Sequence, residues 1–200
     1  YKRQLLFPMI RFHGRWSELK DEDFLLAYSN YYYAFKGYQM TKGAKPYDGN
    51  KNYMQKENKK NKIGPKAKEY LTKMIETCRE NKIQLLFIET PAPKTWNKTK
   101  HREMKKWAIQ NNIPFFDMNL VTKDLQMDWN KDTTDKGYHM NILGAEKISK
   151  CLGNYLKSQY QLPNHKEDAN YEQWEKDTQE YEFKKQELYQ EIKKKGKNAI

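Results

Sequence analysis

The chain has 200 residues, and its 38 Lys and Arg against 26 Asp and Glu give a formal net charge of +12. This length suits one α/β domain with a core of its own, or at most two domains. Aromatic residues make up 14% of the chain, which excludes a chain that is disordered throughout, because disordered chains are poor in aromatic residues. The composition therefore indicates a folded domain with a charged appendage.

The positive charge does not by itself identify a partner. Lys residues are spread along the whole chain and often mixed with Glu, as in 184–187, which favours a solvated surface. No zinc-finger pattern or aromatic RNA-binding signature accompanies the charge, so nucleic acid is a weak hypothesis. No run of about 18 apolar residues is present, so no transmembrane helix is predicted. The chain opens at Tyr1 without an initiator Met or signal peptide, which suggests a fragment or a processed product.

The first 64 residues contain a predicted helix and a long loop. Ser17 precedes an acid-rich turn, which is typical of a helix N-terminus. The segment 38–64 is polar and rich in Lys, Asn and Gly, which predicts a long excursion loop. Long loops in compact domains are often functional, so this loop is a candidate working surface.

Residues 65–118 alternate between helical and strand patterns. Pro65 suits a first helical position, and apolar residues then recur at helical spacing as far as Cys78. The following patterns predict a buried strand at 83–88, a helix at 98–111 and a second strand at 113–118. Helix, strand, helix, strand in this order requires crossover units and a parallel sheet.

The last helix of the domain is predicted to begin near Asn141 or Ile142. After Pro163 the chain is dominated by Glu, Lys, Gln and Tyr, which predicts a charged helical tail with at least one docked face. Cys78 and Cys151 both lie on apolar helix faces and are expected to be buried free thiols. One pair is too few for a disulfide framework, and neither residue belongs to a metal-ligand spacing.

Three segments are expected at the carboxyl ends of the parallel strands, where open α/β sheets bind ligands: 89–101, 117–119 and 128–139. The third holds His139, with Asp135 and Asp132 upstream. A carboxylate that accepts from one ring nitrogen fixes the tautomer, and the other nitrogen can then take a proton from a nucleophile. An exposed histidine without a partner, in an Asp-rich turn, is the alternative.

The segment 139–145, His-Met-Asn-Ile-Leu-Gly-Ala, resembles the final motif of SGNH (GDSL-like) hydrolases, in which an Asp and a His share the loop before the last helix. More narrowly, the chain resembles SGNH-like envelope proteins of clostridial bacteria, through 12–19, 91–101, 114–119 and 162–166, the last together with Tyr171 and Trp174. The resemblance implies an α/β fold, a three-layer flavodoxin-like sandwich with a parallel sheet. In this chain the sandwich would lack its N-terminal strands. The expected division is a partial SGNH-like domain at 1–160 and a charged aromatic helical tail at 161–200.

Carried over by position, the resemblance implies that His139 is the general base and Asp135 its orienting carboxylate. The family pattern places the Asp three residues before the His. Asp135 lies four residues before His139 and Asp132 seven, so Asp132 stays the alternative. The family's nucleophilic Ser lies in a Gly-Ser motif after the first strand, and no Ser here qualifies. Without that nucleophile and its oxyanion donors, this chain by itself is expected to be inert as an esterase.

Further candidate residues surround the expected cleft. His13 with Arg15 could contact an anionic substrate or serve the structure. The candidate substrate-binding residues after the first predicted strand are Glu89, Trp96, Asn97 and His101. The alternatives are that His101 packs on its helix face and that Trp96 and Asn97 only pack within the loop.

The resemblance implies a serine esterase or O-acyltransferase that acts on cell-envelope glycopolymers, with an acylated carbohydrate as partner and with no metal or cofactor. It also implies a cell-envelope or extracellular location, with a membrane anchor that precedes this chain, although a cytoplasmic location stays open. The alternative is a catalytically inactive SGNH-like module that binds glycan or protein through the tail and the 38–64 loop. A nucleic-acid-binding module is the third hypothesis, and the oligomeric state stays open.

Overall fold

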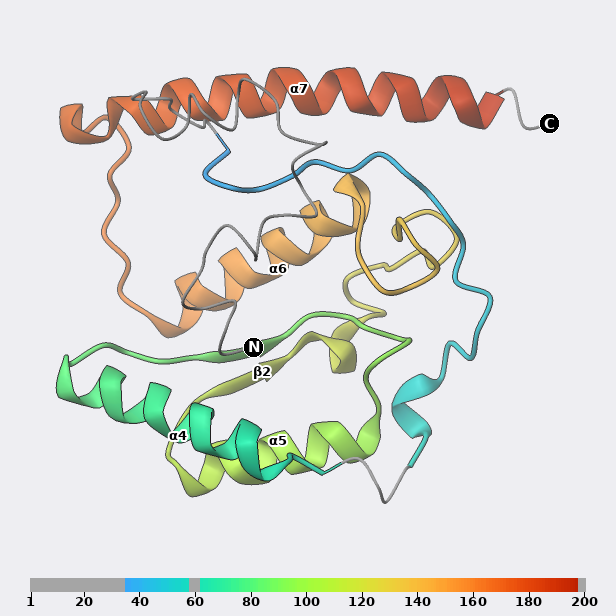
Figure 1. Cartoon of the computed structure of the whole chain (residues 1–200). Coiled ribbons are helices and arrows are strands. Elements are labelled where there is room, and N and C mark those ends of the chain that lie inside the picture. Colours follow the sequence, from blue (N-terminus) through green and yellow to red (C-terminus); the bar gives the residue numbers. More distant parts are fainter. Residues whose placement is uncertain (1–34, 58–61, 198–200) are drawn as a thin grey trace, which may run out of the picture.

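The computed structural model describes residues 35–57 and 62–197, with side chains as far as residue 192 (Figure 1). The expectations for His13, Arg15, Ser17 and the segment 12–19 lie outside the described residues. The elements in chain order are η2 (Tyr53–Gln55), α4 (Pro65–Glu80), β1 (Phe87–Glu89), α5 (Lys98–Gln110), β2 (Phe115–Asp117), η3 (Met118–Val121), α6 (Ile142–Gln159), η4 (Ala169–Tyr171) and α7 (Glu172–Lys197).

The described part of the sheet consists of β1 and β2, which pair in parallel with Phe87 opposite Phe115 and Glu89 opposite Asp117. The crossover through α5 that the sequence predicts is confirmed. Both strands are shorter than the apolar runs 83–88 and 113–118, because only three residues of each belong to the parallel pairing within the described part of the chain.

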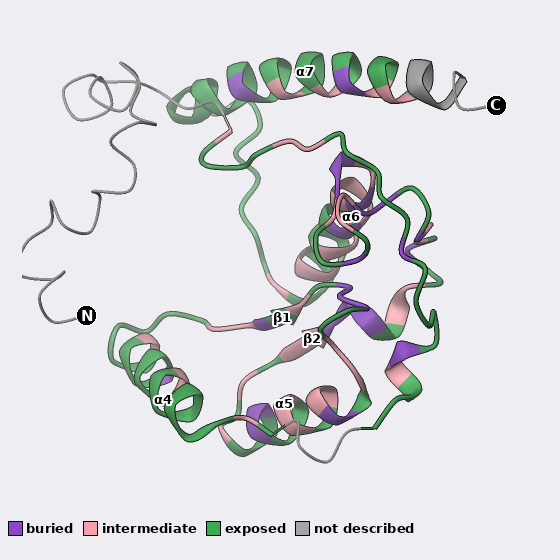
Figure 2. Cartoon of the chain, turned by 45° about the vertical axis from the view of Figure 1, so that its right-hand side comes forward, coloured by how far each residue is buried: buried purple, intermediate pink, exposed green. Residues whose placement is uncertain are grey.

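The sheet lies between α4 and α5 on one face and α6 on the other (Figures 1 and 2). Successive side chains of a strand point to opposite faces, and Phe115 and Phe116 of β2 follow this rule. On the α5 side, Phe115 packs in one cluster with Phe87 and Trp107, whose ring centroids are 5.8 Å apart. On the α6 side, Phe116 stacks on Tyr155 at 4.3 Å. The fold is therefore mixed α/β, as predicted.

The 38–64 loop is not a free excursion where it is described. Its backbone runs beside the segment before α6, with Lys45 N donating to Thr133 O at 3.0 Å and Tyr47 N to Trp129 O at 2.8 Å. Tyr47 and Tyr53 are buried, and both rings meet the Trp129 ring edge-on. This aromatic cluster fastens the loop over the carboxyl ends of the strands.

The tail forms the long helix α7, which lies along one side of the molecule (Figure 2). Its shielded positions follow helical spacing, which confirms the expected docked face: 177, 181, 185, 188, 189 and 192. Leu188 is buried, while Phe183 on another face is 67% exposed. Within the described residues, no helix is both long and apolar enough to cross a membrane.

The two cysteines correct one expectation. Cys78 and Cys151 are free thiols on α4 and α6, but both are only half-buried. Each lines an open surface pocket, Cys78 beside Arg79 and Cys151 beside Lys150, so the neighbouring elements cover it incompletely. Burial, followed by the charge of Asp124, raises the pKa of the Cys151 thiol.

Candidate functional site

The candidate site lies at the carboxyl ends of β1 and β2, where Glu89 and Asp117 are register partners. The loop after β1 and the loop before α6 meet there. A Cβ on Gly137 would lie 3.0 Å from the ring of Tyr47 and 3.1 Å from Pro93. Gly137 also has a φ of +94°, which favours glycine, so this close approach of the two loops needs a glycine.

His139 and Asp135 form a pair on the loop before α6. His139 Nδ1 lies 2.5 Å from Asp135 Oδ2, and the His139 backbone N–H donates to Asp135 Oδ1 at 2.7 Å. One carboxylate thus holds both the ring and the backbone of the same histidine. If Nδ1 carries the hydrogen toward the carboxylate, Nε2 is left as an acceptor, and the His139 side chain is 78% exposed.

The pair also perturbs the carboxyl group. Desolvation of Asp135 opposes its charged form, but hydrogen bonds from the His139 side chain and backbone outweigh that effect. They hold the pKa of Asp135 below its usual value. Asp135 therefore keeps its charge beside the histidine as the pH falls, which is what an orienting carboxylate requires.

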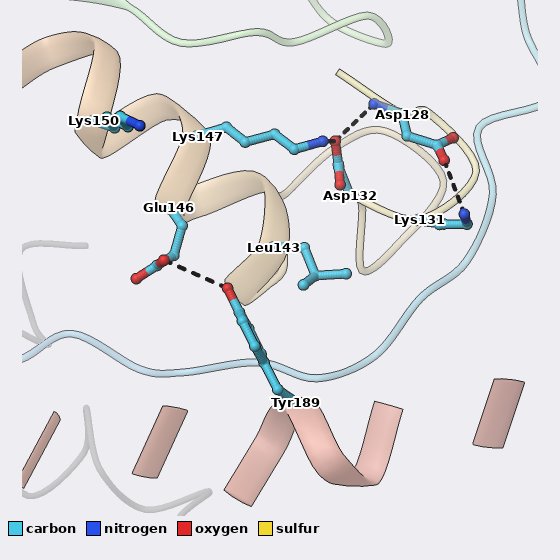
Figure 3. A pocket seen from close by; sticks show the side chains of 8 residues that line it. All are labelled: Asp128, Lys131, Asp132, Leu143, Glu146, Lys147, Lys150 and Tyr189. Atoms are coloured by element: carbon cyan, nitrogen blue, oxygen red, sulfur yellow. Dashed lines mark hydrogen bonds and ion pairs between the residues drawn. The ribbon is translucent and has the colours of Figure 1, made fainter. Parts of the chain in front are cut away.

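Asp132, the alternative orienting residue, lies elsewhere. It is buried and accepts from Lys147 Nζ at 2.7 Å and from the Asp128 backbone N–H at 2.7 Å. Figure 3 shows Asp132 and Lys147 in a pocket between α6, α7 and the 128–132 turn. The structure thus brings Asp135 to His139, whereas Asp132 ties the turn to α6.

Asp117, at the end of β2, binds two of the predicted substrate-binding residues. Its Oδ2 accepts from Trp96 Nε1 at 2.8 Å and lies 2.7 Å from His101 Nδ1. Its Oδ1 accepts from the backbone and the side-chain amide of Asn119, at 2.9 and 2.7 Å. The Asp117 side chain is 1% exposed, so it is a buried carboxylate surrounded by three N–H donors and the His101 ring nitrogen. Trp96 and His101 thus join the loop and α5 to β2.

Asn119 extends this cluster. Its Oδ1 accepts from Tyr53 OH at 2.7 Å and from Ala92 N at 2.8 Å, and its Nδ2 donates to Thr90 O at 3.0 Å. Asn119 therefore fastens the loop after β1 at two backbone points. The sequence placed Asn119 at the carboxyl end of the second predicted strand but gave it no role. It contained no signal for Tyr53, because the residue that Tyr53 binds, Asn119, lies 66 positions away in the chain.

Glu89 and Asn97 complete the predicted set. Asn97 caps α5, because its side chain accepts from Lys100 N at 3.1 Å, so its side-chain oxygen already has a structural use. Glu89 is half-buried beside Asp117. Burial and the charge of Asp117 raise the pKa of Glu89 to about 7, with the charge of Lys100 acting in the opposite direction. Glu89 is therefore a proton-holding group near neutral pH.

Two further expectations concern the nucleophile and metals. Ser149 and Ser158, the serines in the described part of the chain, both lie on α6 rather than on the loops at the strand ends. Within the same described ranges, no group of three or more potential ligands is placed to hold a metal ion. Comparison of the chain with protein-family models, curated proteins and solved structures found no match.

Proposed function

We propose that His139 and Asp135 are the general base and the orienting carboxylate of an SGNH-type site, in a domain of the three-layer flavodoxin-like kind. The proposed reaction is the hydrolysis or transfer of an acyl ester on a carbohydrate polymer of the cell envelope. The observation that carries the proposal is that the Asp135 carboxylate contacts both the ring nitrogen Nδ1 and the backbone N–H of the exposed His139. The resemblance of 139–145 to the SGNH motif supplies the reaction class.

In the proposed step, His139 Nε2 takes the proton of a hydroxyl group whose oxygen bonds to the acyl carbon. The imidazolium that forms faces the charged Asp135, and it then gives the proton to the leaving alkoxide. The sequence contains no Gly-Ser pair. The proposal therefore assigns the base to this chain and requires the nucleophile from a segment or partner that is not part of it.

A variant series tests the base. In the protein that carries this chain, His139→Ala should lower kcat for 4-nitrophenyl acetate by about 100-fold or more, the usual contribution of a general base. The matched control is His165→Ala, which removes another histidine that lies beside an Asp, at 3.5 Å. Full activity in His139→Ala with an unchanged melting temperature would overturn the assignment.

A second comparison separates the two carboxylates. Asp135→Asn should lower kcat with little change in stability, whereas Asp132→Asn should lower the melting temperature, because it breaks a buried ion pair. A readout independent of turnover is the NMR-detected pKa of Asp135. It should rise toward its ordinary value in His139→Ala, because the hydrogen bonds that lower it are reduced.

The second candidate is a catalytically inactive SGNH-like module that binds glycan or protein. It is favoured by the absence of a Gly-Ser pair from the sequence. In that case the wild-type protein and His139→Ala should hydrolyse the ester equally slowly, while binding to its partner persists.

A further inference from the structure

A groove of about 410 Å³ lies where the tail begins, within the range of about 300–1,000 Å³ typical of ligand sites. It is formed by the connector between α6 and α7 and by the first turns of α7. Its walls carry two well-exposed aromatic rings, Trp174 at 56% and Tyr171 at 36% exposure. None of the proposed acyl-transfer chemistry uses these residues.

The connector is held in a defined shape by its own contacts. The His165 ring stacks on the Tyr171 ring, with centroids 4.0 Å apart and planes 21° apart. Asp168 accepts from Asn170 N at 3.0 Å and lies 3.5 Å from His165 Nδ1. Glu167 has a φ of +70°, a conformation that costs energy in a residue with a Cβ. These contacts orient the Tyr171 ring at the groove.

Trp174 is oriented as well. Lys36 Nζ lies 4.2 Å from the centroid of the indole, a cation–π contact that occupies one face of the ring. A ligand in the groove can therefore stack only on the opposite face. An aromatic side chain has few rotatable bonds, so stacking on it costs little conformational entropy.

The rim of the groove supplies hydrogen-bonding groups of both kinds. Lys166 carries an ammonium donor and Glu175 a carboxylate acceptor. In the part of the chain that the structure describes, neither side chain forms a hydrogen bond or an ion pair. A pyranose ring matches this arrangement, because it combines an apolar C–H face with hydroxyl groups that both donate and accept. A nucleic-acid strand matches less well, since the Glu175 carboxylate repels phosphate.

We propose that the groove between Tyr171 and Trp174 binds a pyranose unit of a carbohydrate chain, with the sugar stacked on the aromatic rings. This binding site is separate from the His139–Asp135 pair and does not depend on any turnover there. It would hold a carbohydrate polymer at the tail of the protein whether or not the acyl-ester proposal is correct.

Isothermal titration of the full chain with a tetramer of N-acetylglucosamine, and separately with cellotetraose, tests the proposal. Saturable binding of at least one tetramer is expected. Trp174→Ala and Tyr171→Ala should each weaken it about tenfold, the effect of losing one stacked ring. Trp174→Phe should retain part of the affinity, because a smaller ring still stacks.

The matched control is Phe183→Ala, which removes an exposed aromatic ring on the same helix that does not line the groove. Its affinity should equal that of the wild type, as should that of His139→Ala. No binding of either tetramer, or equal binding by Trp174→Ala with a native circular dichroism spectrum, would overturn the proposal. Tighter binding of a single-stranded deoxythymidine oligomer than of either tetramer would overturn it in favour of nucleic acid.

Discussion

At the scale of single residues, Glu89 shows how the sheet changes the chemistry of a side chain. Parallel pairing places it directly beside Asp117, which is buried and accepts from Trp96 and Asn119. Burial of Glu89, followed by the charge of Asp117, raises the pKa of Glu89 to about 7. The sequence placed Glu89 at a strand end, but it could not supply the neighbouring charge that raises its pKa.

This raised pKa predicts a pH dependence of stability. The folded chain binds the Glu89 proton more tightly than the unfolded chain does, so folding stability falls as the pH rises from the ordinary value of 4.5 to about 7. Glu89→Gln removes that cost. The full difference in pKa corresponds to about 3 kcal/mol, which solvent screening of this half-buried group reduces, so we expect Glu89→Gln to be more favourable at pH 8 than at pH 4.5 by about 2 kcal/mol. Urea denaturation at the two pH values measures the difference.

The control for this experiment is Glu76→Gln, which changes an exposed side chain on α4. An effect of Glu89→Gln that is the same at both pH values, as expected for the control, would contradict the raised pKa of Glu89.

At the scale of elements, the start of α6 shows what a local pattern determines. The sequence predicts a helix start at Asn141 or Ile142, and Asn141 is the N-cap, accepting from Leu143 N at 3.0 Å and Gly144 N at 3.2 Å. The pattern did not reveal the second use of this side chain. Its Nδ2 donates to Gly43 O and Lys131 O, so the cap also joins the helix to two loops.

Two variants of Asn141 separate these uses. Asn141→Ala loses the cap and leaves two carbonyl groups without their donor, so we expect a loss of about 2–3 kcal/mol in unfolding free energy. Asn141→Asp keeps the capping oxygen but not the donor, and an intermediate loss should follow. Thermal denaturation of both proteins gives the comparison. If Asn141→Asp were as stable as the wild type, the bonds to Gly43 and Lys131 would contribute nothing.

At the scale of the whole molecule, α7 is fastened to the rest of the chain by polar contacts around one buried leucine. Glu146 on α6 accepts from Tyr181 OH at 2.9 Å and from Tyr189 OH at 3.5 Å, and it lies 3.3 Å from Lys185 Nζ. Figure 3 shows the Glu146–Tyr189 bond crossing from α6 to α7. Further ion pairs join α7 to the 36–42 segment, namely Lys36–Asp177 and Lys42–Glu191. The Lys42–Glu191 pair is exposed and contributes little, whereas Asp177 and Lys185 are shielded from solvent. Burial of the Leu188 side chain adds an apolar contribution of about 2 kcal/mol.

Leu188→Ala should therefore release α7 without unfolding the sheet. Hydrogen exchange should become faster along α7, by the equivalent of about 2 kcal/mol, while α4 keeps its protection. Phe183→Ala is the matched control, because this exposed ring on the same helix should leave the exchange unchanged. An equal loss of protection from hydrogen exchange in α4 and α7 would show that residues 1–160 and 161–200 unfold together. That result would contradict the division into a domain and a tail that the sequence suggests.

The sequence by itself determined the mixed α/β class, the order of the helices and strands from residue 65 onward, and the parallel pairing. These features follow from hydrophobic periodicity and local end signals, which depend on residues only a few positions apart. It also placed His139 on one loop with two candidate carboxylates, Asp135 and Asp132, and the family resemblance favoured Asp135.

Only the tertiary structure decided the rest of the site. The choice of Asp135 over Asp132 as the neighbour of His139 depends on Lys147, which draws Asp132 toward α6. The inward positions of Trp96 and His101 likewise depend on Asp117, which lies beyond α5 in the chain. Such contacts form between residues brought together by folding, and a single sequence contains no periodicity that records them.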